Sequence, residues 1–330
     1  MSQLVLSGED LEFAGSVAGK IMENVEKVLI GQHETIRRVL TAMVAGGHVL
    51  LEDTPGTGKT VMAKSLARSI DGSFSRIQFT PDLLPSDVTG LSYYNQKEGA
   101  FVFRQGPLFT NILLADEINR ATPRTQSALL ECMEERQVTV DGVTYPLLPP
   151  FFVIATENPI ESSGTFPLPE AQLDRFLMKL SMKFPDKNEE IDILNRFLVD
   201  EPLSDLTYVC NTEDILKLNK FYRHVYVHPA LMEYITDICA ATRTRNSVIA
   251  GVSPRGTIAF LRCSQAYAFL DGRGYVVPED IKAMAECVLP HRIVTSRGFG
   301  GVQTTDHLVH EILDNIPAPT EDFTRKDITT

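Results

Sequence analysis

Apolar and polar positions follow two alternating patterns along the first half of the chain: short, continuously apolar runs, and longer segments in which apolar residues recur at helical spacing. Short runs predict strands at residues 48–52, 74–79, 111–116, 151–155 and 176–182, the first of them buried, and the longer segments predict helices at 13–28, 32–45, 60–70 and 123–135. Strands that are apolar along their whole length, separated by helices, favour a parallel sheet with helices on both faces. We therefore predict an α/β fold, whose ligands bind at the carboxyl ends of the strands.

Two segments interrupt this alternation and predict β-hairpins. Residues 90–107 carry a Lys-Glu-Gly turn at 97–99, and residues 136–148 carry Asp141-Gly142 between residues of alternating polarity. Four aromatic residues of the first hairpin could form a contact surface for a protein client: Tyr93, Tyr94, Phe101 and Phe103. Because large apolar side chains are usually buried, we expect instead that they pack the hairpin onto the core.

From about residue 201 the pattern becomes helical. Helix starts are predicted where capping residues or first-turn prolines precede apolar runs, at Asn211 or Thr212, Pro229, Ser253-Pro254 and Pro278. We therefore predict two domains, an α/β core at residues 1–200 and an all-α domain at residues 201–330.

Composition narrows the classes of function. The chain has 330 residues and a formal net charge of −12, which disfavours nucleic acid and anionic membrane surfaces as partners. We expect no membrane span and no secretory signal, because no apolar run is long enough for the first and no basic segment precedes an apolar run for the second. The five cysteines have no C-x-x-C spacing, so we expect reduced core residues and a cytoplasmic location.

A glycine-rich segment follows the first predicted strand. Residues 53–60 read Asp-Thr-Pro-Gly-Thr-Gly-Lys-Thr, which matches the phosphate-binding pattern G-x-x-x-x-G-K-[ST] except for Asp53 at its first position. Glycines let the backbone wrap closely around phosphates, and the amides at the start of the following helix face the anion. Lys59 would reach the β and γ phosphates, and the Thr60 hydroxyl would ligate Mg²⁺. The expected nucleotide contacts in this segment are Thr54, Pro55, Gly56, Thr57, Gly58, Lys59, Thr60 and Val61.

Polar residues end two further predicted strands. Asp116 and Glu117 follow an apolar run, where Asp116 would hold Mg²⁺ and Glu117 would polarise the attacking water. Acidic residues at the end of a strand are common by themselves. These two indicate a nucleotide site because they follow the glycine-rich segment. Asn158 follows the strand at 151–155 and could orient the same water or touch the γ-phosphate, although Asn-Pro after a strand is otherwise simply a turn.

Two arginines are candidates for stabilising the charge that develops during phosphoryl transfer. Arg175 precedes the last predicted strand, where an ordinary surface ion pair is the alternative that the sequence alone favours. Arg255 lies in the first turn of a predicted helix, which is unfavourable against the helix dipole, so we expect it to have an anionic partner. A lid helix that carries Arg255 to the nucleotide would provide one.

In this order, these elements resemble an AAA+ ATPase, and the chain is similar in particular to the MoxR family. The residues at 79–87, 116–121 and 168–176 match signatures of that family, and the resemblance covers roughly residues 20–320. It implies an αβα core with a helical lid. It also implies that the hairpin at 90–107 is the helix-2 insert and the hairpin at 136–148 the pre-sensor-1 insert.

The resemblance also implies roles for individual residues. Asn158 would be sensor 1, Arg175 the arginine finger and Arg255 sensor 2, and the segment 28–32, with Ile30 and Gly31, would pack on the adenine. The chain departs from the family pattern at Asp53 and at Glu157, where many members have Gln. The carboxylate of Glu157 could slow hydrolysis.

The function that the resemblance implies is ATP hydrolysis to ADP and phosphate, with Mg²⁺, by a chaperone-like motor. Members usually form hexameric rings and work with a protein that carries a von Willebrand factor A domain, to remodel, assemble or activate client proteins. Two alternatives stay open: the ATPase subunit of a metal-chelatase-like complex, and a slow nucleotide-dependent binding switch. A nucleic-acid motor is disfavoured by the acidic charge.

Overall fold

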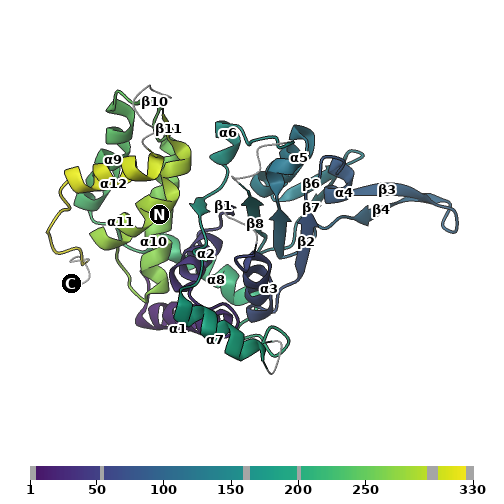
Figure 1. Ribbon diagram of the computed structural model, residues 1–330, viewed down its shortest axis with the longest axis horizontal. Coiled ribbons are helices and arrows are strands. Elements are labelled where there is room, and N and C mark those ends of the chain that lie inside the picture. Colours follow the sequence, from purple (N-terminus) through teal and green to yellow (C-terminus); the bar gives the residue numbers. More distant parts are fainter. Residues whose placement is uncertain (1–4, 53–55, 159–163, 199–201, 296–303, 325–330) are drawn as a thin grey trace.

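The core of the protein is a twisted parallel sheet between two layers of helices, shown in Figure 1. The computed structural model describes residues 5–52, 56–158, 164–198, 202–295 and 304–324. The sheet has five strands in the order β2-β5-β8-β1-β9. Its strands are β1 (Val49–Glu52), β2 (Phe74–Gln78), β5 (Ile112–Asp116), β8 (Phe152–Glu157) and β9 (Met178–Leu180). The predicted α/β fold and all five predicted strands are confirmed.

Alternate residues of each strand face the two sides of the sheet, as the pleat requires. On β1, Leu50 packs into one core with residues of α5 (Pro123–Glu135), whereas Val49 and Leu51 pack into the other. The core that contains Val49 and Leu51 is covered by α1 (Gly8–Glu26), α2 (His33–Val44) and α3 (Lys59–Ser69), and it continues into the C-terminal helices. The continuously apolar strands are therefore explained, because both of their faces are buried.

Both predicted hairpins are present. The first, β3 (Gly90–Asn95) and β4 (Ala100–Gln105), follows the short helix α4 (Pro85–Thr89) and extends away from the body (Figure 1). The second consists of β6 (Gln137–Val140) and β7 (Val143–Pro146). A stack between Phe103 and Tyr145, with ring centroids 4.3 Å apart, joins the two hairpins.

The expected burial of the hairpin aromatics is wrong for three of the four residues. Tyr93, Tyr94 and Phe101 are exposed, and Phe101 keeps 75% of its surface. The reason is that β3 and β4 reach beyond the edge of the core, so only Phe103, nearer the base, finds Phe109 and Tyr145 to pack against.

The C-terminal part is helical, as predicted. It contains α8 (Thr212–Phe221), α9 (Pro229–Thr244), α10 (Pro254–Leu270), α11 (Pro278–Val288) and α12 (Thr305–Asn315). Asn211 and Ser253 cap α8 and α10 with their side chains. A short ribbon of β10 (Val248–Ala250) and β11 (Val294–Thr295), too brief to produce a periodic pattern, was not predicted.

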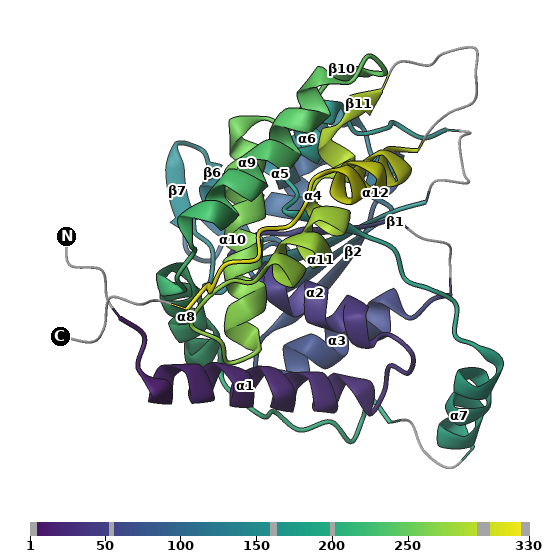
Figure 2. The same ribbon diagram turned by 90° about the vertical axis from the view of Figure 1, so that its left-hand side faces the viewer.

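The helical part is tied closely to the core (Figure 2). The side-chain amide of Asn219 on α8 donates to the carbonyls of Met43 and Val44 at the end of α2. Helix α10 packs against α1 and α2. Three further elements are the short helix α6 (Glu170–Leu173) before β9, the helix α7 (Lys187–Phe197) after β9, and the 3-10 turn η3 (Pro290–Arg292) after α11. The predicted boundary at residues 200/201 falls outside the described residues and stays a prediction.

Two further features concern the described residues. All five cysteines are buried and none forms a disulfide. No helix in the ranges given above is long and apolar enough to cross a bilayer.

A buried histidine at the start of β1 makes stability depend on pH. His48 Nδ1 accepts a hydrogen bond from the Val153 amide at 3.0 Å, so Nε2 carries the proton and donates to the Met133 carbonyl at 3.0 Å. Burial, and then the nearby Arg136 guanidinium, hold the pKa of His48 well below its ordinary value. The folded chain therefore keeps the imidazole neutral, whereas the unfolded chain takes up a proton below about pH 6.5.

The stability that neutral His48 contributes is complete above about pH 6.5 and is lost as the pH falls, by about 1.4 kcal/mol per pH unit. We expect the melting temperature to fall between pH 6.5 and 5, and the His48→Gln variant to fall less steeply. An amide can make both hydrogen bonds of His48 without titrating. Equal slopes in calorimetric scans of the two proteins would contradict this assignment. Buried His291, which also has a lowered pKa, contributes equally to both.

Candidate functional site

Within the glycine-rich segment, residues 56–58 form a tight turn directly before α3. Gly56 and Gly58 have φ angles of 93° and 95°, which favour glycine. Gly58 also lacks room for a side chain, because a Cβ atom there would lie 2.8 Å from Leu29 Cδ1. Helix α3 begins at the next residue, Lys59, so its free amides point back toward the turn. Thr54 and Pro55 lie outside the described residues.

A cavity of about 300 Å³ opens beside this turn, at the carboxyl ends of β1, β5 and β8. It is lined by Gly56, Gly58, Lys59, Thr60, Val61, Arg76, Gln78, Asp116, Glu117 and Asn158. Eight of these residues are ones that the sequence singled out, and the strand order brings them together from three separate segments. Thr57, between the two glycines, is buried. The cavity combines amides and a lysine for an anion with two carboxylates on the opposite wall.

The two carboxylates are held by hydrogen bonds. The Thr156 hydroxyl donates to Asp116 Oδ1 at 2.7 Å and accepts from the Glu117 amide at 2.8 Å. Glu117 has a left-handed backbone with φ of 56°, and the Arg120 guanidinium pairs with its carboxylate at 3.0 Å. A non-glycine residue in this conformation costs free energy and persists where surrounding contacts fix it, often at functional sites.

Arg76 and Gln78 were not anticipated from the sequence. Both lie on β2, where Arg76 Nη2 donates to Asp116 Oδ2 at 2.7 Å and Gln78 Nε2 donates to Glu117 Oε2 at 2.8 Å. The contacts arise because β2 pairs with β5 in a register that sets Gln78 opposite Asp116. Polar residues on either side of the buried Ile77 in β2 were the available signal, but their target depends on a strand order that the sequence does not state.

A larger cavity of about 600 Å³ lies between the N-terminal segment and helices α11 and α12. Gly31, with φ of 73°, lines it together with Glu52 at the end of β1, and Ile30 beside it is half-buried. The chain passes from the wall of this cavity at Glu52 to the wall of the smaller one at Gly56. The segment expected to contact adenine therefore lies next to the segment expected to contact phosphate, as the Leu29–Gly58 approach also shows.

Glu157, one of the two departures from the family pattern, lies opposite Glu52 in the pairing of β8 with β1. Burial raises the pKa of Glu157, and the negative charge of Glu52 adds to this effect while Lys179 opposes it. Lys179 itself pairs with Glu52 at 2.6 Å. This carboxyl group therefore belongs to a small charged cluster beside β1, and Asn158 is the residue of this segment that lines the smaller cavity.

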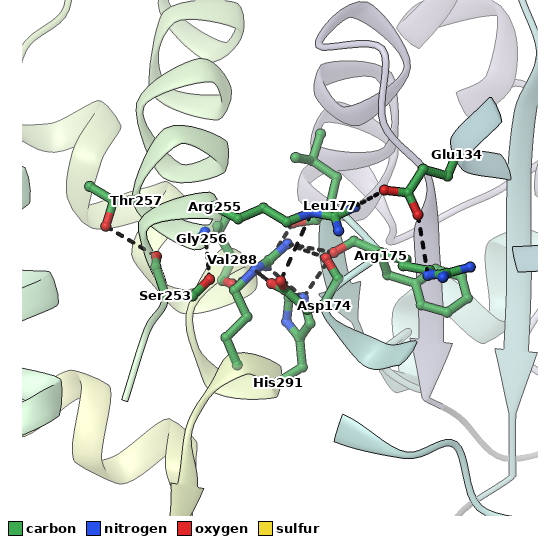
Figure 3. A network of polar contacts seen from close by, with 12 residues as sticks. Glu134, Asp174, Arg175, Leu177, Ser253, Arg255, Gly256, Thr257, Val288 and His291 are labelled. Carbon is green, nitrogen blue, oxygen red and sulfur yellow. Dashed lines mark hydrogen bonds and ion pairs between the residues drawn. The ribbon is translucent and has the colours of Figure 1, made fainter. Parts of the chain in front are cut away.

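Arg175 and Arg255 lie together, but away from the glycine-rich turn (Figure 3). Arg175 Nε lies 3.4 Å from Glu134 Oε2, and Arg255 Nη2 lies 3.2 Å from Glu134 Oε1. Both line a third cavity, of about 590 Å³, with His48 at the amino end of β1. Because β1 and β9 are parallel, Arg175 before β9 lies at the sheet edge opposite to the glycine-rich turn after β1. The expected anionic partner of Arg255 is present, and within one chain it is Glu134.

A buried arginine that the sequence did not single out supports this arrangement. Arg292 Nε donates to Asp174 Oδ1 at 2.8 Å, and its Nη2 donates to the Phe176 carbonyl at 2.6 Å. Burial lowers the pKa of Arg292, and the Asp174 carboxylate opposes that shift. The guanidinium thus joins η3 of the helical part to the segment that carries Arg175.

The described residues contain no group of three or more histidine, cysteine, aspartate or glutamate side chains that could hold a metal ion. The smaller cavity has one carboxylate, Asp116, and one hydroxyl, Thr60, placed for such a role. This set fits Mg²⁺, which usually takes one or two protein ligands and completes its coordination with water and substrate phosphates.

Comparison with known proteins agrees with this geometry. Residues 48–178 match the ATPase family associated with various cellular activities (AAA), and residues 240–312 match the AAA lid domain. YeaC of Bacillus subtilis is 50% identical over 92% of this chain and 95% of its own length, and Chaperone MoxR1 of Mycobacterium tuberculosis is 39% identical over 89% of this chain and 80% of its own length.

A crystal structure of a protein from Cytophaga hutchinsonii superposes with a TM-score of 0.88 at 39% identity, and the match covers 94% of this chain and 98% of that one. The fold and the sequence relatives agree over nearly the whole chain, and the protein belongs to the MoxR family of AAA+ ATPases.

Proposed function

We propose that the chain is an ATP-hydrolysing, chaperone-like motor whose active site is completed by a neighbouring copy in a hexameric ring. The observation that carries the proposal is the separation within one chain of two halves of a phosphoryl-transfer site. The glycine-rich turn and two carboxylates lie at one edge of the sheet, and the two arginines lie at the other. A head-to-tail arrangement of copies would bring the two halves together.

The half at the carboxyl edge has the groups that bind and activate the nucleotide. Gly56 to Val61 would hold the phosphates with their amides, and Lys59 would neutralise the β and γ phosphates. Mg²⁺, held by Asp116 and Thr60, would supply charge neutralisation of the phosphate oxygens. Glu117 would accept hydrogen bonding from the attacking water, and Asn158 would orient that water. Ile30 and Gly31 would contact the adenine from the larger cavity.

The half at the amino edge has the groups that stabilise developing charge. An arginine supplied to the transferred phosphoryl group from another subunit accelerates such reactions by about 10³ to 10⁵. Arg175 and Arg255 share one carboxylate, Glu134, so both would leave the same partner when a neighbour's phosphate attracts them. We assign the arginine-finger role to Arg175 and the sensor-2 role to Arg255.

The proposed work of the motor is the remodelling, assembly or activation of client proteins in the cytoplasm, together with a partner that carries a von Willebrand factor A domain. The exposed aromatic side chains of the first hairpin support a client-contact surface, because clustered exposed aromatics mark interaction sites. Five buried thiols without a disulfide support a reducing location.

ATPase turnover per chain, measured against protein concentration for wild type and Arg175→Ala, tests the proposal. We expect wild-type turnover per chain to rise with concentration as copies assemble, and the variant to be about 10³-fold slower than wild type at the concentrations where the copies are assembled. A wild-type rate that is constant per chain, matched by the variant, would mean that Arg175 has no role across subunits. The protein would then be a self-contained nucleotide switch.

A further inference from the structure

Helix α7 presents its apolar side to solvent. Ile191, Leu194 and Leu198 at and just beyond its last turns keep 45%, 67% and 78% of their surface exposed. Spacings of three and four residues place these side chains on one face of the helix. Phe184, which precedes the helix, is exposed as well. Together they form an apolar patch, which we call the α7 face, of the kind that marks an interaction site.

The opposite side of the helix is attached to the core by polar contacts. The Glu189 carboxylate fills the space beside Gly31, where a Cβ atom would lie 2.6 Å from it. Arg196 Nη1 donates to the Glu26 carbonyl at 2.8 Å. Surface helices normally turn their apolar side inward, so the exposed Ile191, Leu194 and Leu198 give α7 the reverse orientation. Its contacts fix the helix with the α7 face pointing away from the chain to which it belongs.

The position of α7 indicates what covers this face. Glu189 and Gly31 both line the larger cavity, where the nucleotide is proposed to bind. A neighbouring copy that brings its Arg175 and Arg255 to that nucleotide must approach this side of the chain. A lipid surface is a poor candidate, because α7 carries Glu189, Glu190 and Asp192, which an anionic membrane repels.

A complementary stripe exists on helix α10. Arg255, Ile258 and Arg262 are exposed at spacings of three and four residues, and Ile258 keeps 51% of its surface. Helix α10 contains no acidic residue, so this α10 stripe has an apolar centre between two positive charges. The α7 face has an apolar centre with Glu190 beside it and Asp192 on the flank of the same helix. Matching apolar centres with opposite rims favour binding and fix its register.

We propose that the α7 face of one copy binds the α10 stripe of the next copy. The contact is heterologous, because the two surfaces lie on different parts of the chain, and contacts of this type produce closed rings or open helices. In this contact, the neighbour's Arg255 lies at one end of the α10 stripe to which α7 binds. The inference rests on the proposed function only in taking the second copy as the occupant.

Cysteine cross-linking tests which surfaces meet. Leu194→Cys protein and Ile258→Cys protein are mixed with ATP and oxidised, and we expect a disulfide-linked dimer that contains one chain of each variant. The five native thiols do not compete, because burial raises the pKa of each of them. Met232→Cys, at an exposed helical position away from both stripes, is the matched control and should not cross-link with either variant.

A charge exchange tests the energetics without relying on a new bond. Leu194→Asp should weaken assembly at least tenfold in sedimentation velocity with ATP, while nucleotide binding by the separate chains stays unchanged. Met232→Asp should assemble as wild type. Glu190→Arg and Arg262→Glu should each weaken assembly, and the two changes made together in one chain should restore it.

The outcomes separate this inference from the proposed function. Normal assembly of Leu194→Asp, with turnover still dependent on Arg175, would overturn the α7 contact and leave the shared site standing. Cross-linking of Leu194→Cys to itself would overturn the head-to-tail contact in favour of two α7 faces meeting. A wild type that is monomeric at all concentrations, with a constant rate per chain, would overturn both.

Discussion

An equal mixture of two inactive variants, Glu117→Gln and Arg175→Ala, is expected to regain ATPase activity. Glu117→Gln removes the group proposed to activate water, and Arg175→Ala removes the group proposed to act on the neighbour's phosphate. Each variant alone should lose about 10²-fold or more. In a mixed ring, an Arg175→Ala chain keeps a complete nucleotide half, and a following Glu117→Gln chain keeps both arginines. Random mixing creates such a pair at about one contact in four, so roughly a quarter of wild-type turnover should return.

The matched control replaces Arg175→Ala with Lys59→Ala. Lys59 and Glu117 line the same cavity of the same chain, so no pairing of Lys59→Ala with Glu117→Gln rebuilds a site. That mixture should stay inactive. If the first mixture also stays inactive although the variants co-assemble, the two halves do not meet across chains.

Substitution of Arg292 should lower the free energy of unfolding more than any other substitution proposed here. Arg292→Met keeps most of the side-chain volume but removes the donor to the Asp174 carboxylate and one of the two partners of the Phe176 carbonyl, which keeps His291. Breaking a buried ion pair from one side costs about 3–5 kcal/mol, and the loss should lie at the lower end here because 23% of the Asp174 side chain is exposed. Chemical denaturation should show a loss of this size, and ATPase activity should fall with it because Asp174 directly precedes Arg175.

Arg255→Met is the matched control, since Arg255 also lies near Asp174 but is half-exposed. An exposed ion pair contributes about 0–1 kcal/mol, so this variant should unfold almost as wild type does and lose turnover only. Wild-type stability in Arg292→Met would show that the contacts of the buried guanidinium are not what joins η3 to β9.

The core was predictable because its signals are local. The strands β1, β5 and β8 are mainly apolar runs, and Asp141-Gly142 and Ser253-Pro254 specify a turn and a helix start within a few residues. Eight of the ten residues that line the smaller cavity were found for the same reason, since parallel strands end on one side of the sheet and Lys59, Asp116 and Asn158 lie at or beyond the ends of strands.

What was missed depends on contacts between distant segments. Arg76 reaches Asp116 only because β2 is the neighbour of β5, and the sequence does not state that order. Arg292 follows a proline and a histidine in a polar-looking turn, and nothing local marks it as buried. The error over Tyr94 and Phe101 has the same origin, because burial depends on how far β3 and β4 extend beyond the core.

The stack of Phe103 on Tyr145 couples the movements of the two hairpins. Glu134, which holds both arginines, lies in the last turn of α5, and β6 begins at Gln137, immediately after that helix ends. The second hairpin is braced against the first through the stacked rings. If α5 tilts when the arginines leave Glu134, both hairpins would therefore move together as one rigid body. The largest displacement would be at the tip of the first hairpin, around Lys97.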